Sequence, residues 1–204
     1  MKDMRAHDLL RISNAAAFTD LPTFPEWARE SLRAHPFVVV RRALAPDGFV
    51  PVGIRGPERN QRFAALLPAD AIEQRIAPED LSARKHWIDS AVPTPHFEAL
   101  QSVAEAARRN ALIWGPIGSA GFQLATKARA LRPTSDLDIL VRFSSRFSTA
   151  TLRSFQWSLL NAPIPVDVSL EADARAAALD EYLKSPHRLL IKTPNGTELG
   201  VLAA

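Results

Sequence analysis

Apolar and polar residues alternate most regularly in a stretch that reads Thr-Ser-Asp-Leu-Asp-Ile-Leu-Val. Successive side chains of an extended strand point to opposite faces, so this alternation predicts a strand over about residues 136–143. Leu137 and Ile139 are then expected to face a core, with Asp136 and Asp138 together on the opposite face. Two neighbouring carboxylates repel each other unless a positive charge lies close to both. The pattern therefore predicts a strand that presents a paired acidic site.

The rest of the second half shows helical and strand patterns in turn. After Thr94, apolar residues recur at helical spacing, and short β-branched or apolar runs predict strands elsewhere. We expect helices at 94–109, 121–126 and 152–160, and strands at 111–114, 165–170 and 189–191. The strand at 111–114 is expected to end at Gly115 and Pro116. This order predicts an α+β (mixed α/β) fold in which helices flank a mixed sheet.

The first half predicts a smaller α/β domain. Thr23 is expected to cap a helix that has Pro25 near its first position and ends near His35. Strands are expected at 37–40 and 50–54, and their separation by a short turn predicts a small antiparallel sheet. We expect a domain boundary near residue 90, with a substrate- or carrier-docking domain at 1–90 and a catalytic domain at 91–204.

Composition limits the class of protein. The 204 residues are 47% hydrophobic and 23% charged, as in a folded soluble protein, and the net charge is only +3. The absence of cysteine excludes disulfides, thiolate chemistry and cysteine-based zinc sites. The N-terminus does not resemble a secretory signal, and no apolar run approaches the roughly 20 residues that span a bilayer. We expect a cytoplasmic protein without a membrane or nucleic-acid partner.

The acidic pair gains meaning from Gly118 and Ser119, which close an apolar run and open a segment with helical character. Backbone N–H groups and a hydroxyl at such a turn can hold a phosphate, although Ser119 can also simply cap the helix. Mg²⁺ prefers one or two carboxylates together with substrate phosphate oxygens. Asp136 and Asp138 are thus predicted metal ligands, with Mg²⁺ expected and Mn²⁺ as the alternative. The other interpretation is an exposed strand end with two surface aspartates.

A third carboxylate is expected from the strand near residue 167. Asp167 shares one face of that strand with Ser169 and Glu171, while Val166 and Val168 share the other. If this strand lies beside the acidic one, Asp167 can complete a catalytic triad of carboxylates or act as general base on an attacking hydroxyl. The alternative is an edge strand with a solvated polar face.

The remaining charged residues are less specific. Three basic residues lie between the two halves of the motif, where either a triphosphate or solvent would meet them: Lys127, Arg129 and Arg132. Five arginines near strand ends of the first half could bind anionic groups or form a solvated basic face: Arg41, Arg42, Arg55, Arg59 and Arg62. The five histidines show no metal-ligand spacing and are expected to be structural or surface residues: His7, His35, His86, His96 and His187.

Gly118 and Ser119, followed by Ser135-Asp136 and Asp138, resemble the signature of the DNA polymerase β-like nucleotidyltransferase superfamily. A wider resemblance covers nearly the whole chain. It is to the malonate decarboxylase holo-acyl-carrier-protein synthases, also called phosphoribosyl-dephospho-CoA transferases. The segments that carry it are 7–10, 38–42, 52–56, 62–64, 114–126 and the Ser-Asp-Leu-Asp strand. The chain departs from the family at Lys127, where members often have glycine.

The resemblance implies a specific reaction. Members transfer the phosphoribosyl-dephospho-CoA group of 2′-(5″-triphosphoribosyl)-3′-dephospho-CoA to a serine of the decarboxylase's acyl carrier protein, and pyrophosphate leaves. It implies that Asp136 and Asp138 are Mg²⁺ ligands and that Gly118 and Ser119, with Ser135, bind phosphate. Asp167 follows from superfamily logic. Two alternatives stay open: transfer of a nucleotide from an NTP to a protein, small molecule or RNA end, and a degenerate domain kept for partner binding.

Overall fold

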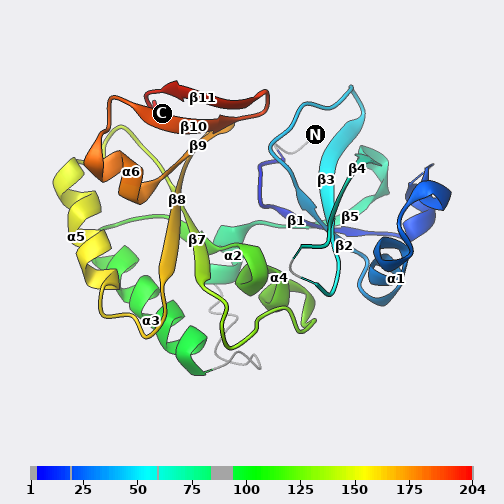
Figure 1. Ribbon diagram of the computed structural model, residues 1–204, viewed down its shortest axis with the longest axis horizontal. Coiled ribbons are helices and arrows are strands. Elements are labelled where there is room, and N and C mark those ends of the chain that lie inside the picture. The colour runs from blue at the N-terminus through cyan, green and yellow to red at the C-terminus, as the bar shows by residue number, and fades with distance from the viewer. Residues whose placement is uncertain (1–3, 19, 59, 84–93, 204) are drawn as a thin grey trace. The chain divides into compact units, whose positions relative to one another are not determined.

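The computed structural model describes residues 4–18, 20–58, 60–83 and 94–203 (Figure 1). The chain forms two compact units, Met1–Ala77 and Pro78–Ala204. The boundary expected near residue 90 falls in a segment that lies outside the described residues. Each unit combines helices with its own β-sheet, which confirms the α+β prediction. Among the described residues, no helix has the length and apolar character needed to cross a membrane.

The N-terminal unit is built on a five-stranded antiparallel sheet with the order β4-β3-β2-β1-β5. The two strands predicted from sequence lie side by side within it, with Val39 opposite Gly53. The elements of this unit are β1 (Leu9–Ile12), α1 (Glu26–Ala34), β2 (Phe37–Val40), β3 (Phe49–Arg55), β4 (Arg62–Pro68) and β5 (Ile72–Ile76), with short 3₁₀ helices at Ala15–Ala17, Leu21–Thr23 and Ala69–Ala71.

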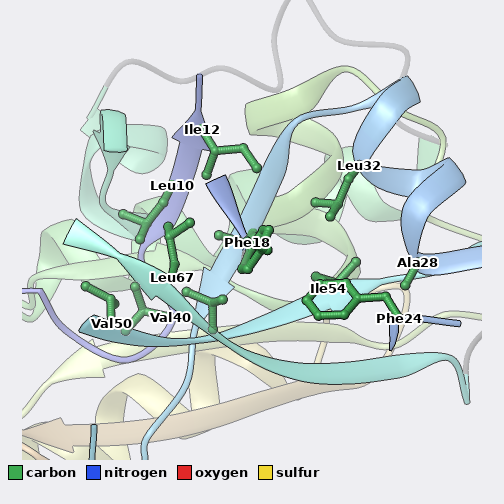
Figure 2. Close-up of a cluster of buried hydrophobic side chains, with 12 residues drawn as sticks. Leu10, Ile12, Phe18, Phe24, Ala28, Leu32, Val40, Val50, Ile54 and Leu67 are labelled. Atoms are coloured by element: carbon green, nitrogen blue, oxygen red, sulfur yellow. The ribbon is translucent and has the colours of Figure 1, made fainter. Parts of the chain in front are cut away.

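Alternate residues of these strands form the core of the N-terminal unit. Val52 and Ile54 are fully buried, and Leu32 of α1 packs into the same cluster (Figure 2). Phe18 and Phe24 complete it, with their ring centroids 5.2 Å apart. The capping prediction for Thr23 was wrong, because Thr23 belongs to a 3₁₀ turn and α1 begins after Pro25 without a side-chain cap.

The C-terminal unit contains a six-stranded mixed sheet with the order β11-β10-β9-β8-β7-β6. Among its described strands, β7 and β8 run parallel, and the other neighbouring strands are antiparallel. Its strands are β6 (Trp114–Pro116), β7 (Leu137–Arg142), β8 (Val166–Ala172), β9 (Arg175–Ala178), β10 (Leu189–Thr193) and β11 (Gly196–Gly200). Its helices are α2 (Pro78–Ala83), α3 (Thr94–Arg109), α4 (Gly118–Thr126), α5 (Thr149–Leu159) and α6 (Leu179–Lys184).

Helices cover both faces of the central strands. In Figure 1, α3 and α5 lie on one side of β7 and β8, and α2 and α4 lie on the other. Leu137 and Ile139 are fully buried in β7, as the alternation predicted. The opposite face of β7 carries Asp138 toward α4 and Arg142 toward α2. This second face is therefore polar at both ends, and it positions the candidate site.

One strand and one helix begin at places that the sequence pattern did not predict. The strand expected at 111–114 is β6, which contains Gly115 and Pro116 instead of ending before them. Proline is tolerated there because β6 is an edge strand, and a side chain at Gly115 would collide with Pro78, whose carbonyl carbon lies 2.2 Å from an added Cβ. Helix α4 begins at Gly118, three residues before the expected start.

Candidate active site

The candidate site lies where β7 and β8 begin. These strands are parallel, and their register places Asp138 directly opposite Asp167. Residues paired in register on neighbouring strands point to the same face of a sheet, about 4.8 Å apart. Asp136 precedes β7 by one residue, and its neighbour Leu137 donates its backbone N–H to the carbonyl of Pro165, just before β8, at 3.0 Å. The fold thus brings all three predicted carboxylates to the end of the strand pair where β7 and β8 begin.

Gly118 is fitted closely to Asp138. Its φ is +59°, in the left-handed region, and a Cβ built on it would lie 2.2 Å from Oδ2 of Asp138. Any L side chain would therefore be strained by the backbone and would overlap the carboxylate. The glycine of the Gly-Ser pair allows the Asp138 side chain to lie against the start of α4.

The connection from β6 to α4 fixes this approach. The N–H of Ile117 donates to the carbonyl oxygen of Asp138 at 3.0 Å, which continues the pairing of β6 with β7 as far as the helix. Ile117 occupies the N-cap position in an extended conformation and provides no side-chain cap. Ser119 lies in the first turn, so it is not the N-cap residue. The N–H groups of the first turn and the dipole of α4 favour anionic groups at this end.

Two of the three predicted carboxylates form no polar contact with the described residues. Within the described ranges, the side chains of Asp136 and Asp167 have no hydrogen bond or ion pair, and Asp167 is exposed. Across those same ranges, no three Asp, Glu or His side chains are close enough together to hold a metal ion by themselves. Two carboxylates with substrate oxygens are nevertheless a common donor set for Mg²⁺, so the residues present fit a site that the substrate completes.

The segment between the two halves of the motif is fastened to α4. Gln123 is buried, and its side-chain oxygen accepts the N–H groups of Ala130 and Leu131, both at 2.9 Å. Lys127 ends the helix with a φ of +63°, in the region that favours glycine. The course of the segment is therefore set by Gln123, even though lysine stands at the position of the left-handed residue.

A tight turn joins this segment to the acidic strand. The N–H of Arg132 donates to the Ser135 hydroxyl at 3.1 Å, and the N–H of Ser135 donates to the Arg132 carbonyl at 2.9 Å. The Ser135 hydroxyl, predicted to bind phosphate, thus accepts a bond that closes the turn before Asp136. The Arg132 side chain is exposed.

Only some of the arginines predicted near strand ends of the N-terminal unit are found close to the same strands. Arg55 and Arg62 lie opposite each other on β3 and β4, and the Arg41 side chain lies beside Gly53, with its Cδ 3.5 Å from an added Cβ. Arg59 lies outside the described residues. The structure places Arg41, Arg55 and Arg62 around the same two strands.

One residue near the site, His96, was predicted only to be a structural or surface histidine. His96 is fully buried in the first turn of α3, and its Nε2 lies 2.8 Å from the carbonyl oxygen of Ser135. The available signal was its helical spacing from Leu100 and Val103, which places a polar residue on the apolar face of the helix. That spacing indicates burial but does not identify the partner, which lies 39 positions further along the chain.

Comparison with known proteins identifies relatives of both units. Residues 5–78 match the family model described as the N-terminal domain of phosphoribosyl-dephospho-CoA transferase MdcG, and residues 80–201 match the model of its C-terminal domain. No solved structure matches the chain.

Curated relatives extend over nearly the full chain. A phosphoribosyl-dephospho-CoA transferase of Pseudomonas putida (strain GB-1) is 39% identical over 98% of this chain and 94% of its own length. One from Azotobacter vinelandii is 39% identical over 86% of this chain and 83% of its own. One from Klebsiella pneumoniae is 35% identical over 96% and 93%.

Proposed function

The chain belongs to the phosphoribosyl-dephospho-CoA transferase family, and from this membership we propose its reaction and the residues that perform it. It is a transferase. Its donor is 2′-(5″-triphosphoribosyl)-3′-dephospho-CoA, and its acceptor is a serine of the malonate decarboxylase acyl carrier protein. The acceptor oxygen forms a bond to the α-phosphorus, the bond from that phosphorus to the bridging oxygen breaks, and pyrophosphate leaves.

The observation that carries the site assignment is the fit of Asp138 against Gly118, with Asp167 in register beside it. This arrangement places the Asp138 carboxylate against the first residue of α4, with the Asp167 position next to it on β8. The N–H groups of that helix end are placed to bind phosphate oxygens of the donor. Phosphoryl transfer depends mainly on positioning and on stabilising dispersed negative charge, and this arrangement supplies both.

Asp136 and Asp138 are the side chains that would hold Mg²⁺, or Mn²⁺, together with donor phosphate oxygens. A bound ion of this kind supplies positive charge for the α-phosphate and the departing pyrophosphate. Asp167, which is exposed and has no partner among the described residues, is suited to accept the proton of the carrier serine. In this scheme Gly118 and Ser119 form the phosphate-binding turn, and Ser135 supports it from the acidic strand.

We also propose that the C-terminal unit belongs to the DNA polymerase β-like nucleotidyltransferase superfamily. Its support is the sequence β6, Gly-Ser turn, α4, acidic strand, followed by a parallel strand with a third carboxylate in register. The N-terminal unit would then bind the CoA-like donor or the carrier protein. Arg55 and Arg62 are suited to anionic groups, so Arg55→Ala is expected to raise the KM of one of these two substrates.

Intact mass of the apo carrier protein tests the proposal directly. After incubation with the chain, Mg²⁺ and the triphosphoribosyl donor, we expect a mass gain equal to one phosphoribosyl-dephospho-CoA group. Asp136→Ala and Asp138→Ala should each abolish the gain. Asp173→Asn is the matched control, because Asp173 is an exposed aspartate in the turn after β8 and lies outside the site.

The donor decides between this reaction and nucleotide transfer. A parallel incubation with ATP should leave the carrier mass unchanged. A gain of one AMP, with none from the triphosphoribosyl donor, would overturn the proposed substrate while retaining the metal site. No gain from either donor with a competent carrier would overturn the proposed function.

A further inference from the structure

His96 touches the backbone of the candidate site from a different element. It lies in the first turn of α3, it is fully buried, and its Nε2 is 2.8 Å from the carbonyl oxygen of Ser135. A carbonyl oxygen only accepts hydrogen bonds, so Nε2 is the donor of this bond. Nδ1 is buried and has no hydrogen-bond partner among the residues described. The ring thus makes a single hydrogen bond within the described part of the chain, and its acceptor is the residue directly before Asp136.

The position of this bond matters more than its strength. The carbonyl of Ser135 and the N–H of Asp136 belong to one peptide group, whose atoms lie in a plane. Holding the carbonyl therefore fixes the direction in which the backbone enters Asp136. On the other side of Asp136, the N–H of Leu137 is bonded to the carbonyl of Pro165. The peptide groups before and after Asp136 are thus bonded to separate parts of the fold.

The Asp136 side chain presents the opposite situation. It is half-buried, and within the described ranges its carboxylate has no hydrogen bond or ion pair. A fixed backbone with an uncommitted carboxylate is the arrangement expected of a preorganised ligand, because outer-shell hydrogen bonds orient the groups that bind the metal or substrate.

We propose that His96 is a positioning residue of the transfer reaction, which holds the Ser135–Asp136 peptide group so that the Asp136 carboxylate meets the donor phosphates and their metal ion. This inference rests on the proposed function. It assigns His96 no contact with substrate and no proton transfer. Its effect is exerted through one hydrogen bond from Nε2 to the Ser135 carbonyl.

Two substitutions at this position separate the hydrogen bond from packing. His96→Gln keeps an amide N–H donor at a reach similar to that of Nε2, whereas His96→Leu fills a similar volume without any donor. Val103→Ala is the control for general destabilisation, because Val103 is fully buried on the same helix. We expect His96→Leu to lower kcat about tenfold, the lower end of losses seen for outer-shell partners, with the KM for carrier protein within about twofold. His96→Gln should recover most of this loss.

Hydrogen exchange gives a readout that does not need turnover. Amides of 132–138 should exchange faster in His96→Leu than in Val103→Ala at equal global stability, and His96→Gln should restore slow exchange. His96→Leu behaving like Val103→Ala in both measurements would overturn the proposal, as would His96→Gln performing no better than His96→Leu.

The outcomes remain distinct if the leucine variant does not fold or the reaction itself is misassigned. His96→Asn then replaces His96→Leu, since its amide lies closer to the backbone and does not reach the Ser135 carbonyl. If the wild type transfers nothing to the carrier, the proposed function fails. The exchange comparison alone then decides whether His96 holds the turn.

Discussion

Both ends of one face of the β7–β8 strand pair carry charged residues, but the surroundings of these charges differ. At the end away from the candidate site (the far end), Arg142 of β7 lies in register with Glu171 of β8 and forms an ion pair with Glu79 of α2. The Arg142 and Glu79 side chains are only 13% and 19% exposed. At the end that carries the candidate site (the near end), Asp138 lies in register with Asp167, and the Asp167 side chain is exposed.

The helix that faces each end explains the difference. At the far end, α2 provides the Glu79 carboxylate, so the Arg142 guanidinium has an ionic partner within the same unit. At the near end, α4 provides Gly118 and a set of backbone N–H groups, and Asp167 is left exposed. The ion pair of the far end contributes to the fold, whereas we propose that the carboxylates of the near end bind a ligand.

Among the substitutions that compare the two ends, the largest effect should come from removing the exposed carboxylate of the near end. Asp167→Asn is expected to lower the transfer rate by about 10³-fold, the range of a lost general base. Thermal unfolding should shift slightly upward, because the substitution removes repulsion between two aspartates in register. Single-turnover transfer to the carrier and the unfolding midpoint measure the two effects. A parallel loss of activity and stability would instead indicate a structural aspartate.

Gly118→Ala should disturb the near end through geometry. The new Cβ overlaps Oδ2 of Asp138, and a displacement of the carboxylate by about 1 Å is expected to cost about 100-fold in kcat. Backbone strain at a φ of +59° adds about 1–2 kcal/mol of destabilisation. Gly48→Ala is the control, since Gly48 has a φ of +82° with nothing within 4 Å of an added Cβ. If both variants lose activity equally, contact with Asp138 is not the cause.

Arg142→Met should have the reverse profile, with stability lost and chemistry retained. Removing the guanidinium leaves the largely buried Glu79 carboxylate without its ion-pair partner, at an expected cost of about 3 kcal/mol in the free energy of unfolding. Arg11→Met breaks an exposed pair with Glu73 and is expected to change stability by less than about 0.5 kcal/mol. Urea denaturation compares the two variants. If Arg142→Met loses kcat at temperatures where it remains folded, the far end also contributes to the activity of the site.

The smallest expected effect is at Lys127, where α4 ends. A left-handed conformation costs a lysine about 1–2 kcal/mol, and glycine recovers this less its larger unfolded-state entropy, so Lys127→Gly should stabilise by about 0.5 kcal/mol. Lys127→Ala removes the same charge but keeps the Cβ, so it should give no such gain. Equal unfolding midpoints for the two variants would show that the backbone is not strained.

Local patterns in the sequence were sufficient for much of the fold. The alternation around Asp136 predicted β7 and the buried side chains of Leu137 and Ile139. The strands expected at 37–40 and 50–54 are present as β2 and β3. By contrast, the short strands β9 and β11 were not predicted, because their residues become strand-like only when paired with neighbours. Helix α6, which has six residues, was not predicted either.

The sequence by itself determined which carboxylates share a face, because a strand alternates its side chains whatever surrounds it. It also determined the family, through residues spread over both units. Only the tertiary structure decided that Asp138 lies opposite Asp167, that Gly118 lies against Asp138, and that His96 reaches the Ser135 carbonyl. Each of these contacts joins residues from different elements. Such contacts depend on strand register and helix packing, which no local pattern encodes.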